Sequence, residues 1–105
     1  GNIVNMPLTP GSGRTEFEAQ WRKHGLPRLI AFEPSLILLS AGFDGHRDDP
    51  LSQLNLLETD YVWLTNEIVK ISERSAGGRI ISSLEGGYNL AALSGTCAAH
   101  VAALL

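Results

Sequence analysis

The feature that most constrains this fold is a short apolar run, Leu36 to Leu39, which small and acidic residues follow directly. The run is too short for an independent helix and shows no polar alternation, which is typical of a strand buried on both faces of a parallel sheet. Four polar residues follow it within six positions: Asp44, His46, Asp48 and Asp49. Polar groups just beyond the carboxyl end of a parallel strand lie where open α/β sheets bind ligands, so we expect any chemistry of this chain here.

The remaining sequence predicts a helix followed by a βαβ unit. Thr15 and Glu18 have the spacing of a capping box, and Gly-Leu-Pro at 25–27 should break or kink the helix that they begin. We expect a second helix from about 58–60 to the glycine pair 77–78, a strand over 79–84 and a last helix over 90–105. Ile3 and Val4 are expected to form one more short strand, which Pro7 would stop.

The last helix is apolar along most of its length. Its expected buried stripe consists of Leu90, Leu93, Cys97, Val101 and Leu104. Cys97 is then a small core residue. His100 lies off the stripe and is expected to be structural or exposed, and His24 in the first helix is expected at the surface.

Composition limits the classes of function. A chain of 105 residues is one domain at most, spanning 1–105, and its net charge of −3 argues against non-specific nucleic-acid binding. No apolar run approaches the length of a membrane span, and no signal peptide is recognisable. The single cysteine excludes an internal disulfide and fits a reducing compartment, so the expected location is cytoplasmic.

The acidic loop leaves several readings open. Asp44 could ligate a metal, act as a general acid or base, or cap a turn, as Asp residues after Gly often do. With His46 it forms an Asp-x-His pair of the kind that zinc accepts, but a catalytic zinc needs three protein ligands and no His/Cys cluster elsewhere supplies the others. Asp49 could cap a backbone amide.

A second group of residues, Glu85-Gly86-Gly87-Tyr88, follows the second strand. Paired glycines allow the backbone to approach a ligand closely. Tyr88 could donate its hydroxyl to a developing oxyanion, or it could simply pack in a tight turn. The carboxyl ends of parallel strands meet at one edge of the sheet, so Asp44 and Tyr88 are expected to face one cleft.

Together these motifs resemble the histone deacetylase superfamily, which includes bacterial acetylpolyamine and acetoin-utilisation-type deacetylases. The resemblance covers the whole chain and rests on five segments: Asn5-x-Pro7-Leu8, Phe32-x-Pro34, Ser40-Ala41-Gly42-Phe43-Asp44, Asp49-Pro50-Leu51 and Leu84-Glu85-Gly86-Gly87-Tyr88-Asn89. It implies a three-layer α/β fold with a mainly parallel sheet and flanking helices, and a zinc-dependent hydrolase of acetyl-lysine or acetylpolyamine.

The resemblance also implies roles for individual residues. Asp44 matches a zinc ligand, Tyr88 the tyrosine that stabilises the transition state, and Gly86 and Gly87 the glycine loop beside the acyl pocket. Asp49 with Pro50 matches a loop-shaping pair. His46 falls where the family tolerates other residues, so it is not counted as a ligand.

The family's Asp-x-His ligand motif and paired histidines are absent, because in relatives they lie upstream of the matching region. We therefore expect this chain to be the carboxyl-terminal portion of a deacetylase domain, inactive alone and without tightly bound zinc. Uncovered apolar surface is expected to drive self-association into a homo-oligomer. A non-catalytic interaction module is the alternative. A phosphate- or nucleotide-binding domain is a third alternative, but this chain lacks the glycine fingerprints of that class.

Overall fold

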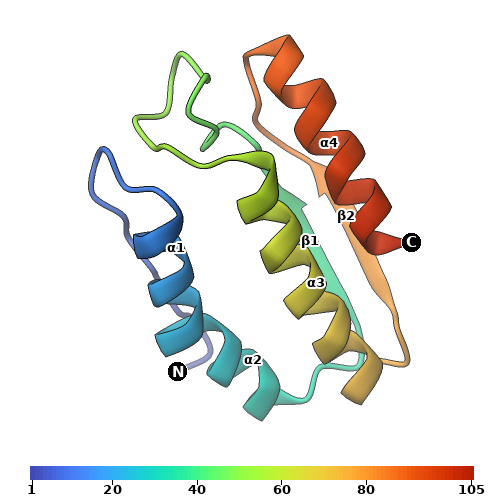
Figure 1. Ribbon diagram of the computed structural model, residues 1–105. Helices are drawn as coiled ribbons and strands as arrows, with labels where there is room; N and C mark the ends of the chain where they lie inside the picture. The colour runs from blue at the N-terminus through green and yellow to red at the C-terminus, as the bar shows by residue number, and fades with distance from the viewer.

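The computed structural model describes all 105 residues (Figure 1). In chain order the elements are α1 Arg14–Gln20, a turn of π-helix Trp21–Gly25, α2 Leu26–Phe32, β1 Ile37–Ala41, α3 Glu58–Ser75, β2 Ile80–Leu84 and α4 Leu90–Leu104. None of these helices combines the length and the apolar character that crossing a bilayer requires.

The two strands lie side by side and run parallel, with Ile37 opposite Ile80 and Ala41 opposite Leu84. Helix α3 makes the connection between them, which confirms the βαβ unit expected from the sequence. The strand expected at Ile3 and Val4 does not form, and that prediction is wrong. Residues 1–9 carry no regular structure, and the side chain of Ile3 is 78% exposed.

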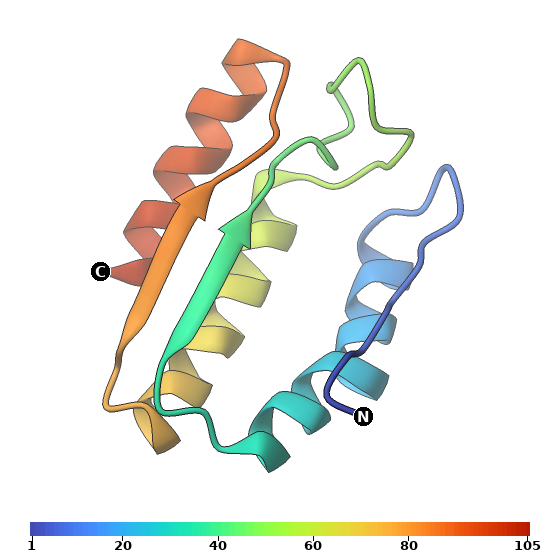
Figure 2. The same cartoon turned by 180° about the vertical axis from the view of Figure 1, so that it is seen from behind.

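All helices lie on one face of the sheet, and no helix covers the other (Figure 2). Burial therefore alternates along β1: Ile37 is buried beneath the helices, whereas Leu38 points to the bare face and is 69% exposed. Ile81 on β2 is 59% exposed. The expectation that β1 is buried on both faces is wrong for this chain, because its residues supply one helical layer only.

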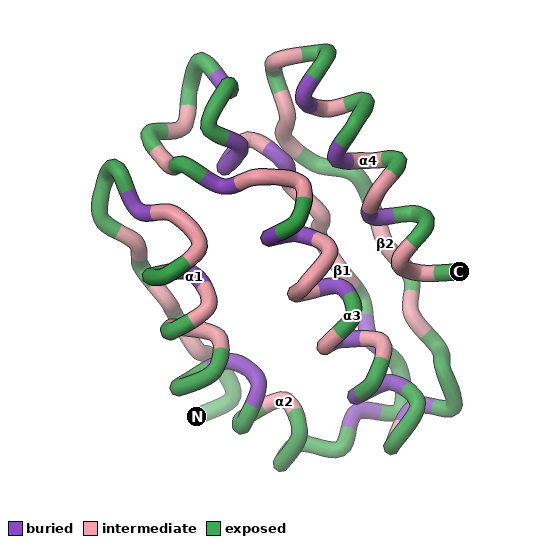
Figure 3. The backbone as a smooth tube through the Cα atoms, in the orientation of Figure 1, coloured by how far each residue is buried: buried purple, intermediate pink, exposed green.

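Two apolar clusters lie between the sheet and the helices. The first joins α1, α3 and the loops that precede and follow the acidic segment: Phe17, Phe43, Leu56 and Tyr61. The second joins α2, β1 and α3: Leu26, Ile37, Ile68 and Ile71. Trp21 packs against both clusters. Figure 3 marks along the backbone which residues are buried.

Helix α1 begins two residues earlier than the capping-box pattern predicted. Gly13 is the N-cap, and its backbone N–H donates to the Glu16 carboxylate at 3.0 Å. Glu18 instead accepts from Arg14 and Arg22, one turn away on either side. The predicted pair of Thr15 and Glu18 is therefore wrong, because the arginines compete for the same carboxylate.

The break predicted near Pro27 takes the form of the π-helical turn that precedes it. Pro27 lies in the first turn of α2, directly after the π-helical turn, and it has no N–H to donate to the preceding helical turn. Gly25 is buried against Trp21, and a Cβ at this position would lie 2.8 Å from the Trp21 Cζ3 atom. The glycine therefore lets the turn pass directly over the indole ring.

Helix α4 buries a different stripe from the one expected. Its buried residues are Ala92, Thr96 and His100, which follow one another at four-residue spacing. Leu90 and Val101 of the predicted stripe are 79% and 46% exposed. The prediction holds for Leu93 and Cys97, which pack partly buried against the first cluster. It fails for Leu90 and Val101, because this helix is apolar nearly all round and its periodicity selects no face.

His100 joins α4 to both α3 and β2. The Thr65 hydroxyl donates to the Tyr61 carbonyl at 2.7 Å, so it accepts from His100 Nδ1 at 2.9 Å. Nε2 then accepts from the Ser82 hydroxyl at 2.9 Å. These roles require a neutral imidazole, and burial lowers the pKa of His100. Of the two expected roles, structural or exposed, His100 has the structural one, although it lies on the buried stripe of α4 and not off it.

Candidate functional site at the carboxyl ends of the strands

Backbone pairing continues past the ends of β1 and β2. The Glu85 N–H donates to the Ala41 carbonyl at 3.0 Å, and the Phe43 N–H donates to the Gly86 carbonyl at 2.7 Å. The loops that follow the two strands leave the sheet at the same edge (Figure 1). This pairing brings Asp44 and Gly86 into contact, although they lie in different loops.

The glycine pair is required by close approach. A Cβ at Gly86 would lie 2.8 Å from Asp44 Oδ2 and 2.9 Å from its Cγ, so the carboxylate packs directly on the Gly86 backbone. Gly87 has φ of 149°, and a Cβ there would lie 2.8 Å from the Leu93 Cδ1 atom. Side chains at 86 or 87 would displace the Asp44 carboxylate or the Leu93 side chain, respectively.

Tyr88 lies beyond the glycines with its side chain 55% exposed. Its backbone N–H donates to Asp49 Oδ2 at 2.9 Å. The next residue, Asn89, donates from Nδ2 to the Asp48 carbonyl at 3.0 Å and caps α4 by accepting from the Ala92 N–H. The structure thus places Tyr88 at the sheet edge that also carries Asp44. Residues 88 and 89 join the two loops by their hydrogen bonds to Asp49 and Asp48.

His46 is buried and fully engaged within the protein. Its side chain is 2% exposed, with Nε2 at 3.0 Å from Glu58 Oε1 and Nδ1 accepting from the Asp48 N–H at 3.1 Å. The pKa of the Glu58 carboxyl is lowered by its own backbone amide and, against the opposing effect of burial, by His46. Because both imidazole nitrogens are used, His46 has none free for a metal beside Asp44.

Tyr61 supports the acidic loop from below. It is 9% exposed, and its hydroxyl lies so close to Gly45 that a Cβ there would sit 2.7 Å from it. Burial, and then the negative charge of Asp44, raise the pKa of Tyr61 well above its ordinary value. The Phe43 ring packs edge-on against it with centroids 5.2 Å apart. The hydroxyl therefore stays protonated beneath the loop that carries Asp44.

The donor set of this chain does not fit a zinc ion. No group of three or more His, Cys, Asp or Glu side chains is arranged to hold a metal. Catalytic zinc sites use three protein ligands, whereas Asp44 is the one candidate ligand that the sequence motifs supply here. These residues can contribute to a metal site but cannot form one.

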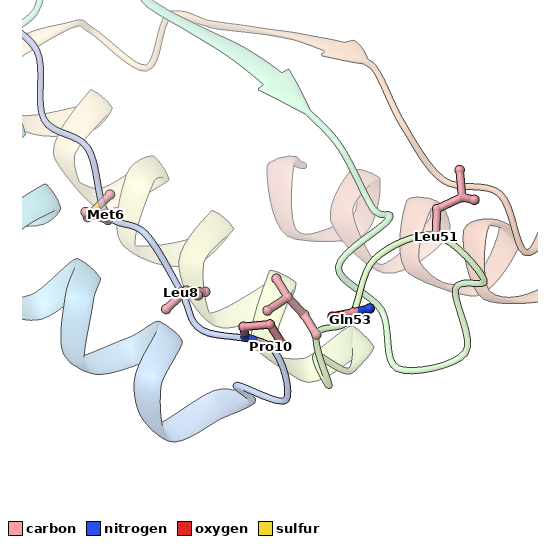
Figure 4. Close-up of a pocket in the computed structure, with 6 residues that line it drawn as sticks. Met6, Leu8, Pro10, Leu51 and Gln53 are labelled. Carbon is pink, nitrogen blue, oxygen red and sulfur yellow. The ribbon is translucent and has the colours of Figure 1, made fainter.

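A surface hollow of about 470 Å³ lies beside the acidic loop (Figure 4). It separates the N-terminal segment from the end of the loop, and its lining residues are Met6, Leu8, Pro10, Leu51, Gln53 and Leu54. Neither Asp44 nor Tyr88 is among them. The candidate site residues therefore lie on the open sheet edge and not in this hollow.

Three further residues shape the site without having been predicted to do so. Glu58 holds His46, Tyr61 supports Gly45, and Asn89 joins the two loops. Asn89 just before an apolar helix carries a capping signal that could have been read. Glu58 and Tyr61 read only as helix residues, because their partners are distant in sequence.

The chain matches known proteins over nearly its full length. A family model described as the histone deacetylase domain matches residues 1–104. The chain is 49% identical over 90 residues to type-2 histone deacetylase 2 of Dictyostelium discoideum, which covers 86% of this chain and 5% of that protein. Over 105 residues it is 38% identical to the chloroplastic histone deacetylase 14 of Arabidopsis thaliana, covering 100% and 25%.

A bacterial relative is the histone deacetylase-like amidohydrolase of Pseudomonas aeruginosa, 36% identical over 89 residues that cover 85% of this chain and 23% of that protein. Among solved structures, the HD domain of HDA15 matches with a TM-score of 0.88 and 32% identity, over 96% of this chain and 28% of that one. The chain spans a quarter or less of the length of these curated relatives.

The structural match extends to a second solved protein, the histone deacetylase Clr3, with a TM-score of 0.86 and 30% identity. The α/β class expected from the sequence, with a parallel sheet and flanking helices in a deacetylase-like arrangement, is therefore confirmed. The family model, the relatives and the solved structures agree on one family. The chain belongs to the histone deacetylase family.

Proposed function

We propose that this chain is the carboxyl-terminal portion of a zinc-dependent deacetylase domain that hydrolyses acetyl-amide bonds. The observation that carries the proposal is the contact of Asp44 with Gly86 at the sheet edge from which Tyr88 projects. In this proposal Asp44 supplies one zinc ligand, Tyr88 a hydroxyl donor, and Gly86 and Gly87 the backbone beside the acyl group. The substrate class is acetyl-lysine or an acetylated polyamine.

The reaction adds water to the amide carbonyl and releases acetate and an amine. The carbonyl oxygen gains negative charge as the tetrahedral intermediate forms, and a hydroxyl fixed nearby stabilises that charge. Tyr88 suits this role because its side chain is half exposed while its backbone is held by Asp49. The glycine pair leaves room for the acyl group to approach the backbone.

The chain alone is proposed to be inactive. One carboxylate does not hold zinc at useful affinity. His46, the imidazole nearest to Asp44 in sequence, is engaged by Glu58 and the Asp48 N–H and is not free to activate water. The other ligands and the base would come from protein outside these 105 residues. Adding zinc and an acetyl-lysine peptide to the isolated chain should therefore give no hydrolysis.

A chimera tests the proposed roles. This chain would replace the matching segment of the Pseudomonas amidohydrolase, and hydrolysis of acetyl-lysine and acetylpolyamine substrates would be measured with added zinc. We expect an active chimera in which Tyr88→Phe lowers kcat by roughly 10²–10³-fold. Ser75→Ala is the control, because it removes a hydroxyl near the carboxyl end of α3, at the other end of the molecule from the glycine loop.

The results separate the proposal from its rivals. A folded chimera without activity, or one that Tyr88→Phe leaves unaffected, contradicts the assigned roles. Activity of the isolated 105-residue chain, abolished by Tyr88→Phe, would instead refute its proposed inactivity. Both readouts depend on folded protein, which a circular dichroism spectrum of each variant checks.

We propose a second function, a non-catalytic self-associating module, because one face of the sheet is bare. Leu38 and Ile81 are 69% and 59% exposed on neighbouring strands, and exposed apolar sheet surface promotes association. Sedimentation velocity should show concentration-dependent oligomers that Leu38→Thr weakens. A chain that stays monomeric at high concentration rules this function out. The proposed location is cytoplasmic, with neither nucleic acid nor membrane as a partner.

A further inference from the structure

The carboxylate of Asp49 connects the two loops of the candidate site. Its side chain is buried, with the residue 8% exposed, and both oxygens are used. Oδ1 accepts from the backbone N–H groups of Leu51 at 2.8 Å and Ser52 at 3.3 Å. Oδ2 accepts from the N–H of Tyr88 at 2.9 Å, 39 positions away in the chain.

An aspartate that only formed a turn would need the contacts of Oδ1 but not the contact of Oδ2 with Tyr88. Asp side chains commonly accept from amides two or three residues further on, and Oδ1 does so. The second oxygen instead leaves the local turn and binds the other loop. An aspartate that served its own turn alone would leave that oxygen to solvent.

The Tyr88 segment depends on these contacts for its position. Residues 85–89 lie outside regular structure, and Gly86 and Gly87 leave the backbone there conformationally flexible. Contacts with other segments are therefore needed to fix the position of Tyr88. The segment is tied to the opposite loop at three points: the Gly86 carbonyl, the Tyr88 N–H and the Asn89 side chain. Of these, the bond from Asp49 acts on Tyr88 itself.

The bond is charge-assisted at neutral pH. Burial on its own would raise the pKa of the Asp49 carboxyl, but the amides of Tyr88, Leu51 and Ser52 outweigh burial and hold the pKa below its ordinary value. Hydrogen bonds with an ionised acceptor are about twice as strong as neutral ones. The carboxylate of Asp49 therefore holds the Tyr88 N–H more strongly than a neutral acceptor would.

We propose that Asp49 is a positioning residue for the deacetylation proposed above: its carboxylate fixes the backbone of Tyr88 and so sets the position of the Tyr88 hydroxyl relative to Asp44. The catalytic consequence rests on the proposed function. The positioning itself depends on the contacts of Asp49 alone, so it can be tested without any activity.

The variant Asp49→Asn separates the two halves of the contact. An amide side chain has one acceptor oxygen and one NH₂ group, so it cannot accept on both sides. The carbonyl oxygen should keep the two local amides, which leaves an NH₂ group facing the Tyr88 N–H. Asp49→Ala removes both sides and serves as the second variant.

Amide hydrogen exchange of the 105-residue chain, followed by NMR at neutral pH, tests the positioning. We expect the Tyr88 amide to exchange about tenfold faster or more in both variants, from the loss of one charge-assisted bond. In Asp49→Asn the Leu51 amide should keep its rate. Asp48→Asn is the control, because the Asp48 carboxylate is 58% exposed and makes only loose contacts of 3.8 Å with His46 and Arg47.

Two results overturn the proposal. One is a Tyr88 amide whose exchange is unchanged in both Asp49 variants. The other is an equal acceleration across α3, which would show that Asp49 supports the fold in general and not Tyr88 in particular.

The chimera supplies the catalytic readout. There, Asp49→Asn should lower kcat about tenfold or more, as expected for a misplaced catalytic group, with KM changed by no more than about twofold. A raised KM at unchanged kcat would show that Asp49 acts on substrate binding and would overturn the positioning role. If the unsubstituted chimera is inactive, the proposed function fails, whereas the exchange experiment still decides the position of Tyr88.

Discussion

The substitution Gly86→Ala tests the contact on which the candidate site is built. The new Cβ would lie 2.8 Å from Asp44 Oδ2, about 0.6 Å inside the 3.4 Å at which ordinary contacts begin. The backbone φ of Gly86 is outside the left-handed region, so alanine meets no backbone strain. The whole effect therefore falls on the Asp44 carboxylate, which must move away from its present position.

The expected cost follows from two opposing contributions. Overpacking of a close contact costs about 1–3 kcal/mol, and the lower entropy of the unfolded alanine chain returns about 0.4–1 kcal/mol, which leaves a net destabilisation of about 1–2 kcal/mol. For a domain of this size, each kcal/mol corresponds to a Tm about 4–8 °C lower. Urea unfolding followed by tryptophan fluorescence measures the change.

Gly95→Ala is the matched control. Gly95 lies within α4, and its nearest neighbour to a new Cβ would be Glu58 Oε1 at an ordinary 3.6 Å. Alanine should stabilise this helix position by about 1 kcal/mol, so the two alanine substitutions have opposite expected signs. If Gly86→Ala stabilises the chain as Gly95→Ala does, the close contact with Asp44 does not exist in solution.

A double-mutant cycle identifies the partner. In an Asp44→Ala background no carboxylate opposes the new Cβ, so Gly86→Ala should lose its destabilising effect. The expected coupling energy is about 1–2 kcal/mol, which is typical of residues in direct contact. Additive effects of the two substitutions would show that the cost arises elsewhere in the glycine loop.

Two further substitutions test the packing around the helices. Gly25→Ala should destabilise the chain by about 1–3 kcal/mol, measured by urea unfolding, because its Cβ would overlap the ring of Trp21; an unchanged midpoint would contradict the packing of the π-helical turn. His100 has a lowered pKa in the folded chain, so the unfolded chain binds more protons and the free energy of unfolding should decrease as the pH falls from 7.5 to 5.5. His100→Leu should remove this dependence, at most about 1.4 kcal/mol per pH unit, whereas His24→Gln at the surface should keep it.

The sequence predicted the path of the chain well because its signals there are local. The apolar run at Leu36 to Leu39 and the glycine pair 77–78 mark boundaries that depend on nearby residues, and β1, α3 and β2 begin and end close to the expected positions. The position of Asp44 and Tyr88 at one edge follows from the parallel crossover alone.

The details that failed depend on distant partners. Glu18 could not be excluded as a cap without knowing that Arg14 and Arg22 both reach it. The buried face of α4 is set by Thr65 and Ser82, which hold His100 from two other elements. Periodicity within α4 contains no information about either residue.

The sequence predicts one of the two kinds of contact that Asp49 makes. Asp49 was recognised as a residue that could cap an amide, and its Oδ1 does so. Its second bond, to Tyr88, requires both loops to be folded, because no pattern links positions so far apart. Candidate site residues can therefore be named from motifs, whereas the contacts that hold them in place need coordinates.

The N-terminal segment fastens the acidic loop although it contains no helix or strand before α1. Three hydrogen bonds join the two: Gly11 N–H to the Gln53 carbonyl at 2.6 Å, Asn55 N–H to the Ser12 carbonyl at 2.8 Å, and Asn55 Nδ2 to the Gly11 carbonyl at 3.0 Å. A protease that removes the first dozen residues would therefore remove the hydrogen bonds that hold the loop carrying Asp44. The damage would appear at the sheet edge, far along the chain from the cleaved bond.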